Sequence, residues 1–255
     1  MGKITASGGR ICEEMKTGPG LRFKGTATLD GAPLFNDLVL DMVPGGWTCL
    51  LGASGVGKTT ILRMIAGFET RAVLQGQIIA NDGTGLSERI AYMAQEDLLL
   101  PWATVTANVT LGARLRGEHI DAAKAQALIA RVGLSDHAHK KPHALSGGQR
   151  QRVALARTLM EDRSIILLDE PFSALDAKTR SEMQDLAFEL LEGRTVLLVT
   201  HDPGEAARLA QRIYVMSHRG VDQVPPPEAP APRAVDDQDA LAAQGALMRQ
   251  LREAT

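Results

Sequence analysis

The fold is decided by the stretch Gly52-Ala53-Ser54-Gly55-Val56-Gly57-Lys58-Thr59, which Thr60 follows. It matches the G-x-x-x-x-G-K-[ST] pattern of a phosphate-binding loop, and it lies between a predicted strand (48–51) and a helical run (60–66). Its glycines let successive backbone N–H groups and the start of the helix point at phosphate oxygens. We therefore expect residues 52–60 to bind the phosphates of a nucleotide, with Lys58 on the β and γ phosphates and the Thr59 hydroxyl on Mg²⁺.

Short apolar runs on both sides of this loop predict the strands of a sheet. They cover residues 38–42, 48–51, 89–94, 164–169, 195–200 and 212–216. Helical spacing appears between them, from Ala125 to Val132 before Gly133 and from Met183 to Leu191 before Gly193. Strands that alternate with helices predict an α/β domain with a mainly parallel sheet.

Two adjacent carboxylates, Asp169 and Glu170, end the predicted strand that begins at residue 164. A buried strand that finishes in acidic residues delivers them to the edge of a parallel sheet, where ligands bind. Asp169 is closer to the strand, and we expect it to hold Mg²⁺ through water. Glu170 extends past it, and we expect it to act as the general base on the attacking water.

A second glycine-containing loop, Leu145-Ser146-Gly147-Gly148-Gln149, opens another predicted helix, with Ser146 placed as its N-cap. It has the features of a second phosphate-binding end. The P-loop, this LSGGQ, the acidic pair, the run Ser173–Asp176 and His201 stand in the order found in the ATPases of ABC transporters. Over roughly residues 30–216 the chain resembles that family, and LSGGQ is the motif that other P-loop families lack.

The resemblance implies a P-loop NTPase fold of the ABC type, with a mainly parallel core sheet, an antiparallel β subdomain and a helical subdomain. We expect a flexible leader over residues 1–20, the ATPase domain over 21–222 with the helical subdomain at about 96–160, a proline-rich connector over 223–235 and a C-terminal helix over 236–255. Proline fixes φ and removes backbone donors, so the connector is predicted to be extended.

The resemblance also implies roles for single residues. Gln95 is similar to the glutamine that touches Mg²⁺ and water and senses the membrane partner, and His201 to the switch histidine that contacts the γ-phosphate. Asp176 resembles the acid that couples the two sites of a dimer. In such a dimer Ser146, Gly147, Gly148 and Gln149 of one subunit close on the ATP held by the other, so a homodimer forms on ATP binding.

The segment from Gln95 to Val105 is apolar and carries Trp102, which predicts a partner surface. With Asn108-Val109 and the short tail after Ser217 it resembles importer ATPases of the nitrate, sulfonate and taurine group, including importers of the pyrimidine precursor of thiamine. This implies an integral membrane permease that docks at Gln95–Val105, a periplasmic or lipid-anchored solute-binding protein, and a peripheral location on the cytoplasmic face of the membrane.

Alternatives stay open at this level. The apolar segment could fold onto its own helical insertion. The chain could serve an exporter or a cell-division complex, which share every catalytic motif, or be a non-transport ABC ATPase of repair, chromosome maintenance or translation. The last class usually has long coiled-coil insertions or two ATPase units in a chain, and this sequence has neither feature.

Composition bears on partners and on the adenine contact. The net charge of -2 gives no basic field for nucleic acid, and the two cysteines, Cys12 and Cys49, suggest neither a disulfide framework nor a metal pair. Relatives place an aromatic ring upstream of the P-loop to stack on adenine, but the region around Leu29 has none. Phe23 and Phe35 are the nearest rings, and Phe35 lies in an apolar run that is typical of a core.

Overall fold

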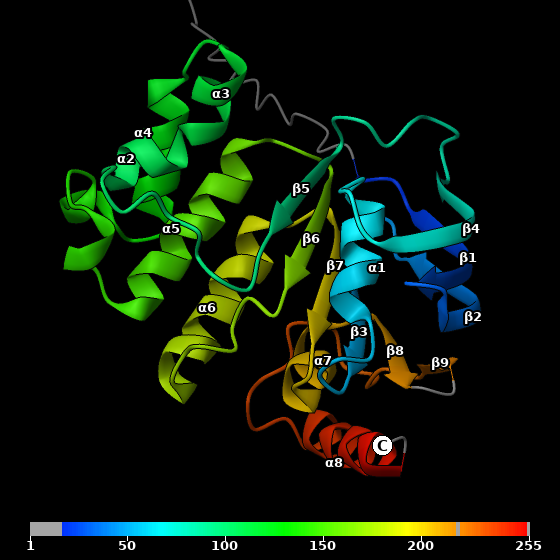
Figure 1. Ribbon diagram of the computed structural model, residues 1–255. Coiled ribbons are helices and arrows are strands. Elements are labelled where there is room, and N and C mark those ends of the chain that lie inside the picture. Colours follow the sequence, from blue (N-terminus) through cyan, green and yellow to red (C-terminus); the bar gives the residue numbers. More distant parts are fainter. Residues whose placement is uncertain (1–16, 218–219, 254–255) are drawn as a thin grey trace, which may run out of the picture.

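A six-stranded sheet forms the centre of the computed structural model, which describes residues 17–217 and 220–253 (Figure 1). The strand order is β5-β6-β7-β3-β8-β9, and every neighbouring pair is parallel except β8 with β9. These strands are β3 (Trp47–Gly52), β5 (Ile90–Met93), β6 (Ile165–Asp169), β7 (Thr195–Thr200), β8 (Arg212–Ser217) and β9 (Gly220–Val224). The predicted mainly parallel sheet is confirmed.

The central strands are apolar because the protein covers both of their faces. Every residue of β3, β6 and β7 is buried. Successive side chains point to opposite faces, so Leu50 joins one hydrophobic cluster while Cys49 and Leu51 join the other. The register pairs Asp169 with Val199 and Leu51 with Thr200, so the carboxyl ends of β3, β6 and β7 meet at one edge.

A three-stranded antiparallel sheet covers one face together with a helix, α1 (Lys58–Ile65) (Figure 1). Its order is β2-β1-β4, with β1 (Leu21–Leu29), β2 (Ala32–Met42) and β4 (Ala72–Ala80). Asp30 and Gly31 connect β1 to β2 with φ of 50° and 82°, the left-handed values that a tight hairpin turn requires. This antiparallel part agrees with the fold class implied by the resemblance.

The other face packs against helices, which extend away from the sheet as a separate group in Figure 1. That group contains α2 (Val105–Val109), α3 (Leu111–Arg116), α4 (Ala122–Arg131) and α5 (Gly147–Met160). The remaining helices are α6 (Ala177–Leu190), α7 (Pro203–Leu209) and α8 (Gln238–Glu253), the last of which lies beside α7.

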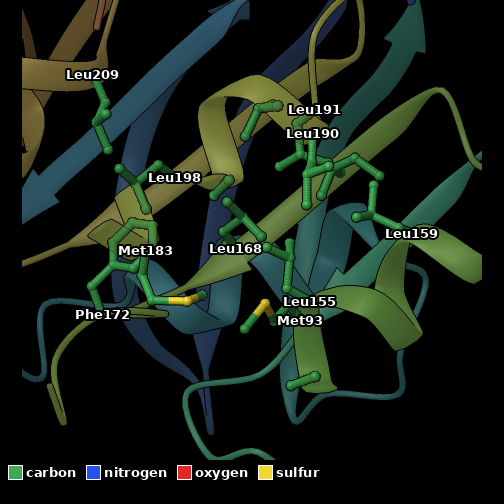
Figure 2. Packing of buried hydrophobic residues seen from close by; sticks show 14 of the residues in the cluster. Met93, Leu155, Leu159, Leu168, Phe172, Met183, Leu190, Leu191, Leu198 and Leu209 are labelled. Atoms are coloured by element: carbon green, nitrogen blue, oxygen red, sulfur yellow. The ribbon is translucent and has the colours of Figure 1, made fainter. Parts of the chain in front are cut away.

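Buried side chains tie the helical group to the sheet. Figure 2 shows Met93 of β5 beside Leu155 of α5, and Phe172 beside Met183 of α6, around Leu168 of β6. All of them are at most 3% exposed. Elements that carry different motifs therefore share one core, which holds the loops at the edge of the sheet in fixed positions.

Hydrogen bonds hold the first described residues and the proline-rich segment to the rest of the fold. Residues 1–16 of the predicted leader lie outside the described residues, but Gly18 donates its N–H to Gly193 O (2.8 Å) and Gly20 O accepts from Asn81 N (2.9 Å). The proline-rich segment, predicted as an extended connector, begins within β9 and is held by Arg233. The Arg233 guanidinium is buried and donates to the carbonyls of Ala207 and Ala210 at the end of α7, both at 2.9 Å.

Candidate nucleotide site

The P-loop connects β3 to α1 through two glycines in left-handed conformations, Gly55 (φ 84°) and Gly57 (φ 105°). Lys58 is 4% exposed, and its ammonium donates to the carbonyls of Gly52 (2.7 Å) and Ala53 (2.8 Å). Burial lowers the pKa of Lys58, and the neighbouring Glu170 opposes this shift. The loop thus holds a buried ammonium at its centre, available to a phosphate oxygen.

A cavity of about 300 Å³ opens over this loop. The residues that line it are Ser54, Gly55, Gly57, Lys58, Thr59, Thr60, Gln95 and Glu170. Backbone donors of the loop and the ammonium of Lys58 face a single carboxylate here, so the cavity combines a polyanion-binding floor with one acidic group.

Two hydroxyl groups hold Asp169. Thr59 Oγ1 donates to Asp169 Oδ1 (3.0 Å), and Tyr92 Oη donates to Asp169 Oδ2 (2.8 Å). Burial and the neighbouring Asp169 raise the pKa of Tyr92, so the phenol remains a donor. The hydroxyl and carboxylate oxygens of Thr59 and Asp169 lie side by side, and such oxygen donors suit Mg²⁺.

Tyr92 is a site residue that sequence reasoning did not identify. A tyrosine inside a strand is typical of β structure and gives no functional signal by itself. Its neighbours explain its place: Tyr92 pairs with Leu167 in the parallel register, two residues before Asp169, so its hydroxyl reaches that carboxylate.

Three predicted site residues converge on Glu170. His201 Nδ1 lies 2.9 Å and Gln95 Nε2 3.2 Å from Glu170 Oε2, and Lys58 Nζ lies 3.8 Å from Oε1. Glu170 has φ 46°, in the left-handed region, and its N–H is held by Val199 O (2.9 Å). A non-glycine residue in that conformation costs on the order of 1 kcal/mol, and such strain gathers at functional sites.

The LSGGQ loop of residues 145–149, called the signature loop below, lies apart from this cavity. Ser146 caps α5: its hydroxyl accepts from Gln149 N (3.2 Å), and Gln149 Oε1 accepts from Ser146 N (2.9 Å), a capping box. Gly147 lines a different cavity with Gln95 and Arg150, and Asp176 caps α6 by accepting from Thr179 N (3.1 Å). The structure therefore brings the P-loop, Gln95, Asp169, Glu170 and His201 together, but not residues 146–149 or Asp176.

The segment after Gln95 is shaped by Asn108, which is fully buried. Its Oδ1 accepts from Leu100 N (2.8 Å), and its Nδ2 donates to the carbonyls of Leu100, Ala103 and Thr104. Leu99 is buried, whereas Leu98 is 58% and Trp102 69% exposed. The segment therefore packs only in part on its own helical group and presents two large apolar side chains to the surroundings.

Neither upstream phenylalanine is available to a base. Phe23 and Phe35 are buried and pack edge to face, with ring centroids 5.8 Å apart. Leu34 lies against the P-loop instead, since its Cδ1 is 2.9 Å from the position that a Cβ on Gly57 would take. Leu34 of β2 and Met216 of β8 are thus apolar side chains beside the P-loop.

Comparison with known proteins decides the family. The profile described as "ABC transporter" matches residues 35–173, which include the P-loop, the signature loop and the acidic pair. The chain belongs to the ABC transporter family. The chain is therefore an ABC ATP-binding protein, an ATPase coupled to transport.

This ABC ATP-binding protein has similar relatives in several bacteria. It is 48% identical over 229 residues to an ABC transporter ATP-binding protein of Haemophilus influenzae, covering 87% of this chain and 94% of the relative. The aliphatic sulfonates import ATP-binding protein SsuB of Delftia acidovorans is 41% identical over 223 residues, covering 87% and 89% of the two chains. SsuB 2 of Agrobacterium fabrum is 46% identical over 192 residues, covering 73% and 71%. In the described part of this ABC protein, no helix has the length and apolarity needed to cross a bilayer.

Proposed function

We propose that this chain hydrolyses ATP to energise an importer for a small solute, through a permease carried on a separate chain. The observation that carries the catalytic part is the convergence of Lys58, Gln95 and His201 on the carboxylate of Glu170 at the P-loop cavity. A carboxylate at that point can accept a proton from water that attacks the γ-phosphate.

The residues divide the chemistry between them. Backbone N–H groups of residues 52–60 and the Lys58 ammonium bind the phosphates, while Glu170 orients water and takes its proton. His201 and Gln95 hold Glu170 through hydrogen bonds. His201 would also contact the γ-phosphate. Thr59, Asp169 and Gln95 would hold Mg²⁺, which neutralises charge that develops on the phosphates. ATP and water thus yield ADP and phosphate.

The signature loop supports a proposal of dimerisation. Residues 146–149 present a capped helix N-terminus, a favourable anion site, yet the P-loop cavity of the same chain is lined by other residues. A second copy can bring its Ser146, Gly147, Gly148 and Gln149 to the open side of that cavity, with Asp176 near the interface. We infer a head-to-tail homodimer that closes on two ATP molecules and reopens after hydrolysis.

The names of the relatives support the importer proposal. SsuB proteins at 41–46% identity are named for the import of aliphatic sulfonates. We propose that the solute belongs to the nitrate, sulfonate and taurine group or is a pyrimidine precursor of thiamine, delivered by a solute-binding protein. The permease would dock on residues 95–105, where Leu98 and Trp102 are exposed, and so hold the chain at the cytoplasmic face.

Uptake in cells tests this proposal. A strain that lacks the chain is complemented with the wild type, and uptake of labelled taurine, nitrate and a 4-aminopyrimidine is measured, with Glu170→Gln as the inactive control. Solute entry only with the wild type supports the importer, and the solute that enters identifies the cargo. Solute efflux, or recovery of the chain on ribosomes or DNA instead of with a permease, would contradict it.

A further inference from the structure

Arg180 connects two loops that carry candidate site residues. Its guanidinium donates through Nη2 to the carbonyl of Leu175 (3.0 Å) and through Nη1 to Asp202 Oδ2 (3.2 Å). Leu175 belongs to the loop that follows Glu170, and Asp202 comes directly after His201. One rigid, planar group therefore spans the connections that leave β6 and β7.

Asp202 is itself held on three sides. Its N–H donates to Thr200 Oγ1 (3.0 Å), its Oδ1 accepts from Gly204 N (2.8 Å) as the N-cap of α7, and its Oδ2 accepts from Arg180. Thr200 and Asp202 are the two neighbours of His201. The backbone on both sides of the imidazole is therefore fixed, and Arg180 relates it to the other loop.

These contacts close a circuit around the proposed general base. The side chains of Glu170 and His201 are hydrogen-bonded, and Asp202 follows His201 in the chain. Arg180 then hydrogen-bonds both the Asp202 carboxylate and the Leu175 carbonyl. Between Glu170 and Leu175 the loop is tightened by Ser173, whose hydroxyl donates to Glu170 O (3.0 Å). This ring of contacts connects the loop that carries the carboxylate to the loop that carries the imidazole.

We propose that Arg180 is a positioning residue for ATP hydrolysis: by bridging Leu175 and Asp202 it holds His201 in register with Glu170. The proposal rests on the catalytic roles inferred above for these two residues. Because Arg180 does not line the P-loop cavity, it acts on the geometry of the reaction and leaves the binding of the nucleotide to other groups.

The kinetic test uses Arg180→Met and a matched control, Arg194→Met. Arg194 also bridges a carbonyl, that of Arg163, and a carboxylate, Asp162 (2.9 Å), but it precedes β7 at the opposite end of the strand. We expect Arg180→Met to lower kcat about tenfold, with KM for ATP changed by less than about twofold, because a small misplacement of catalytic groups costs rate. Arg194→Met should change neither constant, although it loses similar contacts.

Asp202→Asn provides a second route if Arg180→Met folds poorly. Asparagine keeps the cap of α7 but removes the charge that Arg180 pairs with. Its defect should resemble that of Arg180→Met, and the double variant should be no worse than the more severe single variant, since both break the same link. Additive losses in the double variant would show that the two residues act separately.

A readout without turnover separates this proposal from the assigned activity. In the nucleotide-free protein, the His201 imidazole resonance, identified by its loss in His201→Ala, should shift in Arg180→Met and stay in place in Arg194→Met. An unchanged resonance together with a wild-type kcat would overturn the role of Arg180. Full turnover in Glu170→Gln would instead overturn the catalytic assignment, whatever Arg180 does.

Discussion

His201 Nδ1 lies 2.9 Å from Glu170 Oε2, so an imidazole after β7 and a carboxylate after β6 form one hydrogen-bonded pair. An ionised carboxylate accepts only, which places the proton of a neutral imidazole on Nδ1. The imidazole and the carboxylate therefore hold each other beside the P-loop cavity that Glu170 lines.

Glu170→Gln should abolish turnover while ATP still binds. The amide preserves the size of the side chain but cannot take a proton from water, and loss of a general base costs about 10²-fold or more. Phosphate release measures turnover, and fluorescence of a labelled ATP measures binding. Glu182→Gln, on the exposed side of α6, is the control that should behave as wild type. A Glu170→Gln protein that hydrolyses ATP at the normal rate would remove Glu170 as the base.

Lys58→Met should weaken ATP binding by about tenfold or more, because a charge-assisted bond to phosphate is lost. The methionine retains the buried stem but loses the bonds to the carbonyls of Gly52 and Ala53, so the free protein should unfold at a moderately lower temperature. Isothermal titration with ATP and a thermal scan give the two values. Equal affinity in the variant and the wild type would count against the P-loop assignment.

Tyr92→Phe should raise the Mg²⁺ concentration needed for half-maximal ATP binding several-fold. The change removes the donor to Asp169 Oδ2, which leaves that carboxylate less well oriented and costs about 1 kcal/mol of stability. Titration of Mg²⁺ at fixed ATP measures the effect. Tyr214→Phe is the matched control, since that hydroxyl accepts from Asp41 N (3.1 Å) outside the site. A Mg²⁺ requirement unchanged by Tyr92→Phe would show that Tyr92 only fills space.

Glu205→Gln should stabilise the protein at pH 8 and remove part of its pH dependence. Glu205 is 3% exposed, and burial raises its pKa to about 7. At pH values between the pKa of Glu205 in the unfolded chain and its folded pKa of about 7, the folded state binds more protons than the unfolded state. The free energy of unfolding therefore falls as pH rises through this range, by about 3 kcal/mol at most. Urea unfolding of both proteins from pH 5 to pH 8 measures the difference. Glu189→Gln, at an exposed position, should leave the curve unchanged, and a parallel pair of curves for Glu205→Gln would refute the shift.

Trp102→Ala should reduce stimulation of the ATPase by the permease about tenfold, because an exposed aromatic side chain at an interface contributes strongly to binding. Basal hydrolysis should stay near the wild-type rate. Comparison of ATPase rates with and without the purified permease tests this. Leu241→Ala, on the exposed side of α8, is the control. Full stimulation of Trp102→Ala would move the docking surface elsewhere.

Strands of the parallel sheet were predictable because a strand that is buried on both faces consists of consecutive apolar residues. All six predicted strands are present, five of them in the central sheet, while the predicted strand 38–42 is the second half of β2 in the antiparallel sheet. β1, β4 and β9 were not predicted, since each mixes polar residues or glycine with its apolar positions, as Gly76 and Gln77 do in β4. The pairing of β4 also depends on a partner distant in the chain, since it pairs with β1.

The candidate site likewise contains residues that the local sequence predicts and residues that only tertiary contacts bring together. The P-loop, Asp169 and Glu170 are local patterns, and the meeting of His201 with Glu170 follows from neighbouring strand ends. Tyr92 and Arg180 reach the site only through tertiary contacts that no spacing encodes. The roles of these residues, and of Ser146 to Gln149 and Asp176, stay predictions until the variants are measured.

The hydrogen bonds that Asn108 makes to Leu100, Ala103 and Thr104 affect how fast a partner can bind this segment. Because these bonds already order the loop in the free chain, the loop loses little conformational entropy when another molecule covers Trp102. Recognition at this surface should then resemble rigid-body docking, with no folding step to slow each encounter.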